Sequence, residues 1–118
     1  MEAREAILSF QYSEKMKSGL IIGINLLDQL TSLRDEELSG GMKILVGYLE
    51  GLLREVRIVG SVAGLGSFGD LERKVMELIG RVQMSQFEEA QRSFSEAISL
   101  ATTSCQSSMS LLMEKKLI

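Results

Sequence analysis

Few residues of this chain could take part in chemistry, and the most suggestive are three glycines. Gly64, Gly66 and Gly69 have the G-x-G-x-x-G spacing of a dinucleotide-binding turn, and a helical pattern follows from Leu71. In such a turn, glycines let backbone amides and a helix N-terminus approach a pyrophosphate. The spacing therefore makes Gly64, Gly66 and Gly69 candidate ligand-binding residues for an anion.

The sequence around these glycines favours a plain loop between helices. Residues 56–62 can be written as an alternating strand, but Val56 and Val59 also continue the helical repeat that precedes them. No second strand follows, since residues 83–91 open another helical pattern. A lone strand cannot form the parallel sheet that a dinucleotide site requires.

The usual catalytic and metal-binding side chains are scarce. The sequence has no histidine and one cysteine, Cys105, so Ser-His and Cys-His nucleophiles and histidine metal ligands are excluded. A single cysteine also excludes a zinc knuckle. The acidic runs at Asp35–Glu37 and Glu88–Glu89 lie where helices are expected to begin, and the helix dipole explains them. We expect no enzymatic activity, metal or cofactor.

Four segments carry the three-and-four spacing of amphipathic helices. These are residues 3–30, the heptad pattern over 38–59, and the shorter patterns over 71–82 and 87–112. The capping-box spacing of Ser32 with Asp35 and of Ser85 with Glu88 predicts the starts of the second and fourth helices. The pair Gly40-Gly41 leaves open whether the second helix is interrupted.

These elements predict one all-α domain over residues 1–118, a four-helix up-and-down bundle. Proline is absent and aromatics are only 5% of 118 residues, which favours helix over sheet. The helical segments beginning near Ala3, Ser32, Asp70 and Ser85 resemble those of small archaeal up-and-down helical-bundle proteins of unknown function. That resemblance implies a bundle that can be dimeric, and it transfers no site residue.

Two helices carry surfaces suited to a partner. The pairs Gly19 with Gly23 and Gly47 with Gly51 predict close helix packing, within the bundle or across a dimer. The first helix is apolar on nearly every side near Leu20, and the fourth has no charge between Glu96 and Glu114. The candidate interface residues are Gly19, Leu20, Gly23, Ser99, Thr103, Gln106 and Ser110.

The functional hypothesis is a non-enzymatic, self-associating bundle that acts as an interaction or structural module, most simply a homodimer. The alternative is a small-ligand binder, with an anion at Gly64–Gly69 or an apolar molecule in a core rich in the seven methionines. The net charge of −3 argues against nucleic-acid binding. No stretch is apolar enough for a membrane span and no secretory signal is visible, so a cytoplasmic location is expected.

Overall fold

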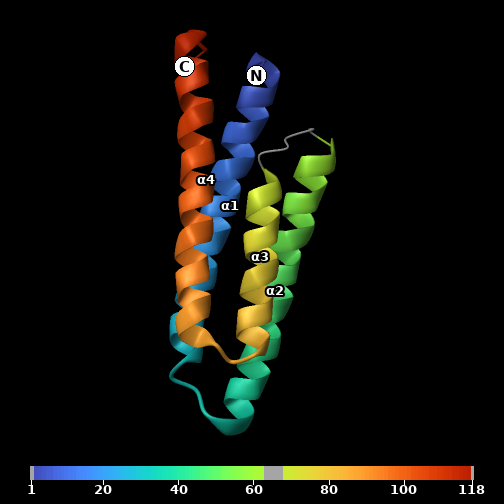
Figure 1. Cartoon of the computed structure of the whole chain (residues 1–118), viewed down its shortest axis with the longest axis vertical. Coiled ribbons are helices and arrows are strands. Elements are labelled where there is room, and N and C mark those ends of the chain that lie inside the picture. Colours follow the sequence, from blue (N-terminus) through green and yellow to red (C-terminus); the bar gives the residue numbers. More distant parts are fainter. Residues whose placement is uncertain (1, 63–67, 118) are drawn as a thin grey trace.

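The computed structural model describes residues 2–62 and 68–117 and confirms the four-helix up-and-down bundle. The helices are α1 (Ala3–Leu30), α2 (Asp35–Val62), α3 (Phe68–Gln83) and α4 (Phe87–Glu114). Each packs antiparallel against its neighbours, with α4 closing the ring against α1 (Figure 1). Helix α2 runs unbroken through Gly40-Gly41, and no strand occurs in the described residues.

The four helices are staggered along the long axis of the molecule. Helices α1 and α4 extend past α3 at the end that holds both termini, and the first turns of α2 project at the other end (Figure 1). The Cα trace is accordingly elongated, with extents of 54 × 22 × 17 Å. The stagger leaves the first turns of α2 projecting beyond the other helices and the last turns of α4 with α1 as their neighbouring helix (Figure 1).

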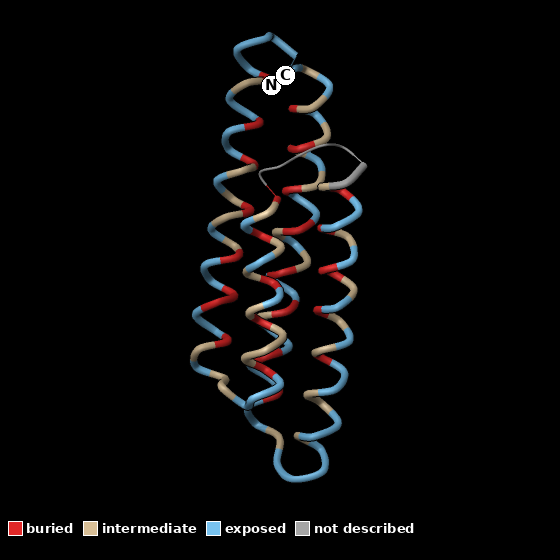
Figure 2. Tube along the Cα trace, turned by 45° about the vertical axis from the view of Figure 1, so that its right-hand side comes forward, coloured by how far each residue is buried: buried red, intermediate tan, exposed pale blue. Residues whose placement is uncertain are grey.

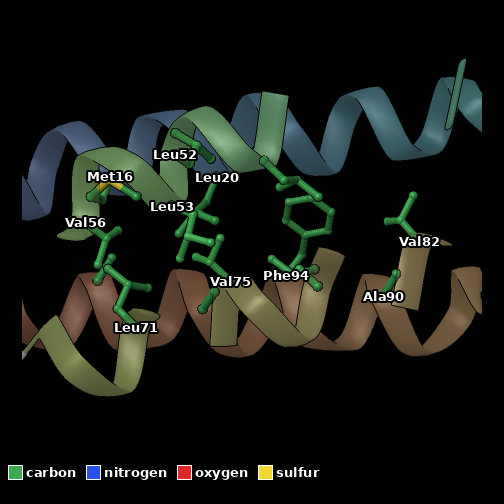
Figure 3. Packing of buried hydrophobic residues seen from close by; sticks show 14 of the residues in the cluster. Met16, Leu20, Leu52, Leu53, Val56, Leu71, Val75, Val82, Ala90 and Phe94 are labelled. Atoms are coloured by element: carbon green, nitrogen blue, oxygen red, sulfur yellow. The ribbon is translucent and has the colours of Figure 1, made fainter. Parts of the chain in front are cut away.

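The core is a column of leucine, valine and phenylalanine along the bundle axis. Buried positions form a stripe on the inner side of each helix (Figure 2). Phe94 of α4 is fully buried, and Figure 3 shows its ring pointing across the bundle among Leu20, Leu53 and Val75. Each large side chain buried in this way contributes about 1.5–3 kcal/mol.

The two predicted capping boxes are wrong. The Ser32 hydroxyl donates to the Gln29 carbonyl oxygen at 2.7 Å, so it closes the end of α1 instead of starting α2. Ser85 has a left-handed φ of 58° in the α3–α4 turn, and no side chain caps the start of α4. Both serines belong to tight turns that fold back onto the preceding helix, which takes their hydroxyls away from the next helix.

The predicted methionine-rich core is also wrong. Met16 is the fully buried methionine of the described residues, and Met42 is half-buried. The exposed ones are Met76, Met84, Met109 and Met113. Their positions flank the helical seams, and the branched residues that fill the seams leave no room for them. An apolar ligand site lined by methionine therefore has no basis in the core.

Candidate interaction surfaces

The interface residues predicted on α1 lie inside the bundle. Leu20 is completely buried. A Cβ atom on Gly19 would lie 2.8 Å from a methyl carbon of Leu52, and one on Gly23 would lie 2.7 Å from the Phe94 ring. These glycines allow α2 and α4 side chains to approach the α1 backbone, so Gly19, Leu20 and Gly23 hold the chain's own helices together.

The residues predicted on α4 are exposed, and two of them line a groove. Ser99, Thr103, Gln106 and Ser110 all face outward. An open groove of about 680 Å³ runs along α4, with Ser99 and Thr103 in its wall. Its other lining residues are Ser9, Lys74, Arg92, Ser95, Glu96, Leu100, Ser104, Ser107 and Ser108. The groove is thus a hydroxyl-rich surface between α3, α4 and the start of α1.

Lys74, Glu77 and Glu96 form an ion cluster at the end of this groove that lies nearer the start of α4. The Lys74 ammonium lies 3.0 Å from a carboxylate oxygen of Glu77 and 3.0 Å from one of Glu96, and hydrogen bonds to these two acids raise its pKa. The Ser93 hydroxyl donates to Glu77 at 2.7 Å, and this bond together with Lys74 lowers the pKa of Glu77. The charge of Lys74 is therefore balanced within the protein, which leaves Arg92 as the exposed cation of the groove.

The contact between the first half of α1 and the second half of α4, which we call the α1–α4 seam, is polar. The Ser108 hydroxyl contacts that of Ser9 at 2.7 Å, and Ser13 donates to Ser104 at 2.9 Å. All buried side-chain N and O atoms of the described residues have a hydrogen-bond partner. These small side chains let the two helices pack closely while satisfying every hydroxyl.

Cys105 belongs to the same seam. Its thiol donates to a carboxylate oxygen of Glu14 at 2.9 Å. Burial and the Glu14 carboxylate raise the pKa of the thiol to about 11. Because the thiolate is the reactive form, this environment makes Cys105 a poor nucleophile near neutral pH.

The outward side of α2 carries exposed isoleucines between glycines. We call this set, Gly40, Ile44, Gly47, Gly51 and Ile58, the glycine face. Its members are spaced by four, three, four and seven residues and so lie on one side of the helix. Ile44 is 74% exposed and Ile58 is 60% exposed. A Cβ atom on Gly40 or Gly47 would meet nothing within 4 Å.

The glycine face was only partly predictable. The Gly47-x-x-x-Gly51 spacing indicated close packing, but no helix of this chain packs on either glycine. Ile44 and Ile58 were not predicted as surface residues, although both fall outside the heptad positions of α2. Towards α1, the apolar surface continues over Leu26, which lines a groove of about 360 Å³ together with Ile44.

The glycine triplet proposed as an anion site lies mostly outside the described residues. Residues 56–62 belong to α2, which confirms the helical interpretation of this segment over the strand. Gly69 lies in the first turn of α3, while Gly64 and Gly66 lie outside the described residues.

No protein-family model, curated protein or solved structure matches this chain. Within residues 2–62 and 68–117, no three acidic, cysteine or histidine side chains gather into a set that could hold a metal ion. None of the four helices, over the same residues, is both long and apolar enough to cross a bilayer.

Proposed function

We propose that this protein is a non-enzymatic interaction module that associates with a second copy of itself through the glycine face of α2. The observation that carries the proposal is Ile44, whose side chain is 74% exposed on the outward side of α2. Ile58 adds a second exposed isoleucine on the same side. Large apolar side chains exposed on one side of a helix are typical of protein–protein contact sites.

The glycines beside Ile44 support the same proposal. A glycine inside a helix costs about 1 kcal/mol relative to alanine. Gly19 and Gly23 offset that cost through close packing inside the bundle, whereas Gly40 and Gly47 have no neighbour within 4 Å in this chain. A helix from a second copy would give these bare backbone segments the close contact that glycine permits.

The non-enzymatic part of the proposal rests on side-chain chemistry. The chain has no histidine, and the pKa of its one thiol is raised to about 11. The Lys74 ammonium donates hydrogen bonds to the Glu77 and Glu96 carboxylates, and the Ser93 hydroxyl donates to Glu77. The cytoplasmic location expected from the sequence stays a prediction.

The proposal is tested by placing a charge at the centre of the glycine face. We expect Ile44→Glu to convert a dimer into a folded monomer, because a buried unpaired carboxylate in the contact would be strongly unfavourable. Light scattering after size-exclusion chromatography measures the mass, and circular dichroism checks the fold. Met113→Glu is the matched control, since Met113 is 60% exposed near the end of α4 and should tolerate the charge in the dimer.

The hydroxyl-rich groove of α4 favours a second candidate function, the binding of a small anionic ligand. Arg92 supplies a cation and Ser95, Ser99 and Thr103 supply hydroxyl donors along one wall. A panel of phosphorylated sugars at millimolar concentration would raise the melting temperature of the wild type but not that of Arg92→Ala. An equal response from both proteins, or none from either, would remove this candidate.

A further inference from the structure

We propose that the second copy docks with its α2 antiparallel to α2 of the first, so that Ile44 of each chain seats on the partner's Gly47. This inference rests on the proposed self-association and adds its geometry. The two-fold axis would pass between the two helices, at the level of α2 midway between Leu45 and Val46. Each protruding isoleucine then meets the bare backbone of a glycine, and Gly40 lies opposite the partner's Gly51.

The side chain of Ile44 in one chain and the bare backbone at Gly47 in the other are complementary in shape. Ile44 is the most exposed large apolar side chain of the described residues, and one turn further on, at Gly47, a Cβ atom would meet nothing within 4 Å. An antiparallel two-fold arrangement brings these two positions together twice, once on each side of the axis. A glycine opposite an isoleucine lets the helix backbones approach closely, because no side chain stands between them.

The charges beside the glycine face point to the same register. Lys43 and Glu50 are both exposed, and both line a groove that includes Gln83 of α3, so they lie on the edge of α2 towards α3. In an antiparallel pair, the two-fold axis is perpendicular to the plane that contains both helices. The edge of one α2 that lies towards α3 is therefore next to the same edge of the partner's α2. Lys43 then lies within about 3 Å along the axis of the partner's Glu50, since each residue advances the helix by about 1.5 Å.

The same register pairs a second set of charges. Arg54 and Glu36 are exposed, and their spacing of seven and eleven residues from Gly47 places them on the same side of α2 as the glycine face. The two-fold axis brings Arg54 within one residue of the level of the partner's Glu36, at the acidic first turn of the partner helix. Both kinds of ion pair occur twice, so that four attractive contacts flank the apolar centre.

A parallel pairing of the two helices would lose all of this complementarity. It would place Ile44 against the partner's Ile44. The edge of α2 that carries Lys43 and Glu50 would face the opposite edge of the partner's α2, so neither charge would meet its counterpart of opposite sign. The two helix dipoles would also be aligned, which is unfavourable. The shape and the charges of this face therefore favour a second copy in antiparallel orientation as its occupant.

Charge reversal tests the geometry. We expect Lys43→Glu and Glu50→Lys each to weaken the dimer by about 10-fold or more, because each change turns two attractive contacts into two repulsive ones. The double variant, which exchanges the two charges, should recover most of the wild-type dissociation constant. Sedimentation equilibrium measures this constant, and Arg4→Glu on α1, an exposed position away from α2, is the control that should leave it unchanged.

The outcomes separate this geometry from self-association itself. Weakening by both single variants with recovery in the double variant supports the antiparallel register. A wild-type dimer that neither single variant weakens, or that the double variant fails to restore, overturns the register and leaves the proposed function standing. A wild-type protein that stays monomeric at all concentrations overturns both.

Discussion

Replacing a glycine of this bundle by alanine has opposite effects on stability at different positions, depending on what surrounds the glycine. A Cβ atom on Gly23 would lie 2.7 Å and 3.1 Å from two ring carbons of Phe94, which is fully buried. A Cβ atom on Gly80 of α3 would meet nothing within 4 Å. Comparing Gly→Ala at these two positions therefore separates the effect of close packing on stability from the effect of helix propensity.

We predict that Gly23→Ala destabilises the protein and that Gly80→Ala stabilises it. Overpacking costs about 1–3 kcal/mol and exceeds the gain of up to about 1 kcal/mol in helix propensity at Gly23. Gly80→Ala keeps only the gain, about 0.5–1 kcal/mol. Urea unfolding monitored by circular dichroism measures both. Stabilisation of the protein by Gly23→Ala would contradict the close contact with Phe94.

The pKa of Cys105, raised from 9.0 to about 11 by burial and by Glu14, predicts slow reaction with thiol reagents. Glu14→Gln removes the carboxylate charge and should lower this pKa, so labelling of the native protein at pH 8 should become faster. A rate equal to that of the wild type would show that Glu14 does not act on the thiol.

The same pKa shift predicts how stability depends on pH. The folded state holds the thiol proton more tightly than the unfolded state does. The stabilisation is therefore complete below about pH 9 and is lost as the pH rises towards 11. Cys105→Ala removes this group, so the fall in unfolding free energy between pH 9 and 11 should be smaller in the variant.

At the scale of the elements, α1 and α4 are joined by hydrogen bonds as well as by apolar contacts. Between Met16 and the start of α1, the α1–α4 seam contains the hydrogen-bonded pairs Ser9 with Ser108 and Ser13 with Ser104. A hydroxyl buried without a partner costs about 1–3 kcal/mol, whereas replacing both partners by apolar groups is nearly neutral.

We predict that Ser108→Ala destabilises the bundle by about 1 kcal/mol or more, because Ser9 is then buried without its partner. The double variant Ser9→Ala, Ser108→Ala should be more stable than Ser108→Ala alone. A double-mutant cycle of unfolding free energies measures the coupling. Strictly additive losses would mean that the two hydroxyls do not interact.

The bounds of the elements were predictable where periodicity decides them. The pattern over residues 3–30 predicted the observed range of α1. The heptad of α2 includes the buried Leu45, Leu49, Leu52, Val56 and Val59 but missed the buried Leu53. The turns were not predictable in the same way. Ser32 and Ser85 have side chains that can serve either adjoining helix, and only the folded turn decides which carbonyl or amide lies within reach.

At the scale of the whole molecule, the surfaces depend on how the helices are arranged around the core. The sequence identified glycine pairs on two helices but could not tell which pair faces inward. The bundle turns Gly19 and Gly23 towards Leu52 and Phe94 and leaves Gly47 outside. The α4 groove was equally unpredictable, because it depends on the stagger between α3 and α4.

The proposed function makes the claim that the bundle acts as a pair of chains joined through α2. Sedimentation equilibrium of the wild-type protein at micromolar concentrations measures whether this pair forms. We predict a mass of twice 13.0 kDa that falls to 13.0 kDa on dilution or with Ile44→Glu. A mass of 13.0 kDa at every concentration, or a dimer unaffected by Ile44→Glu, would contradict the claim.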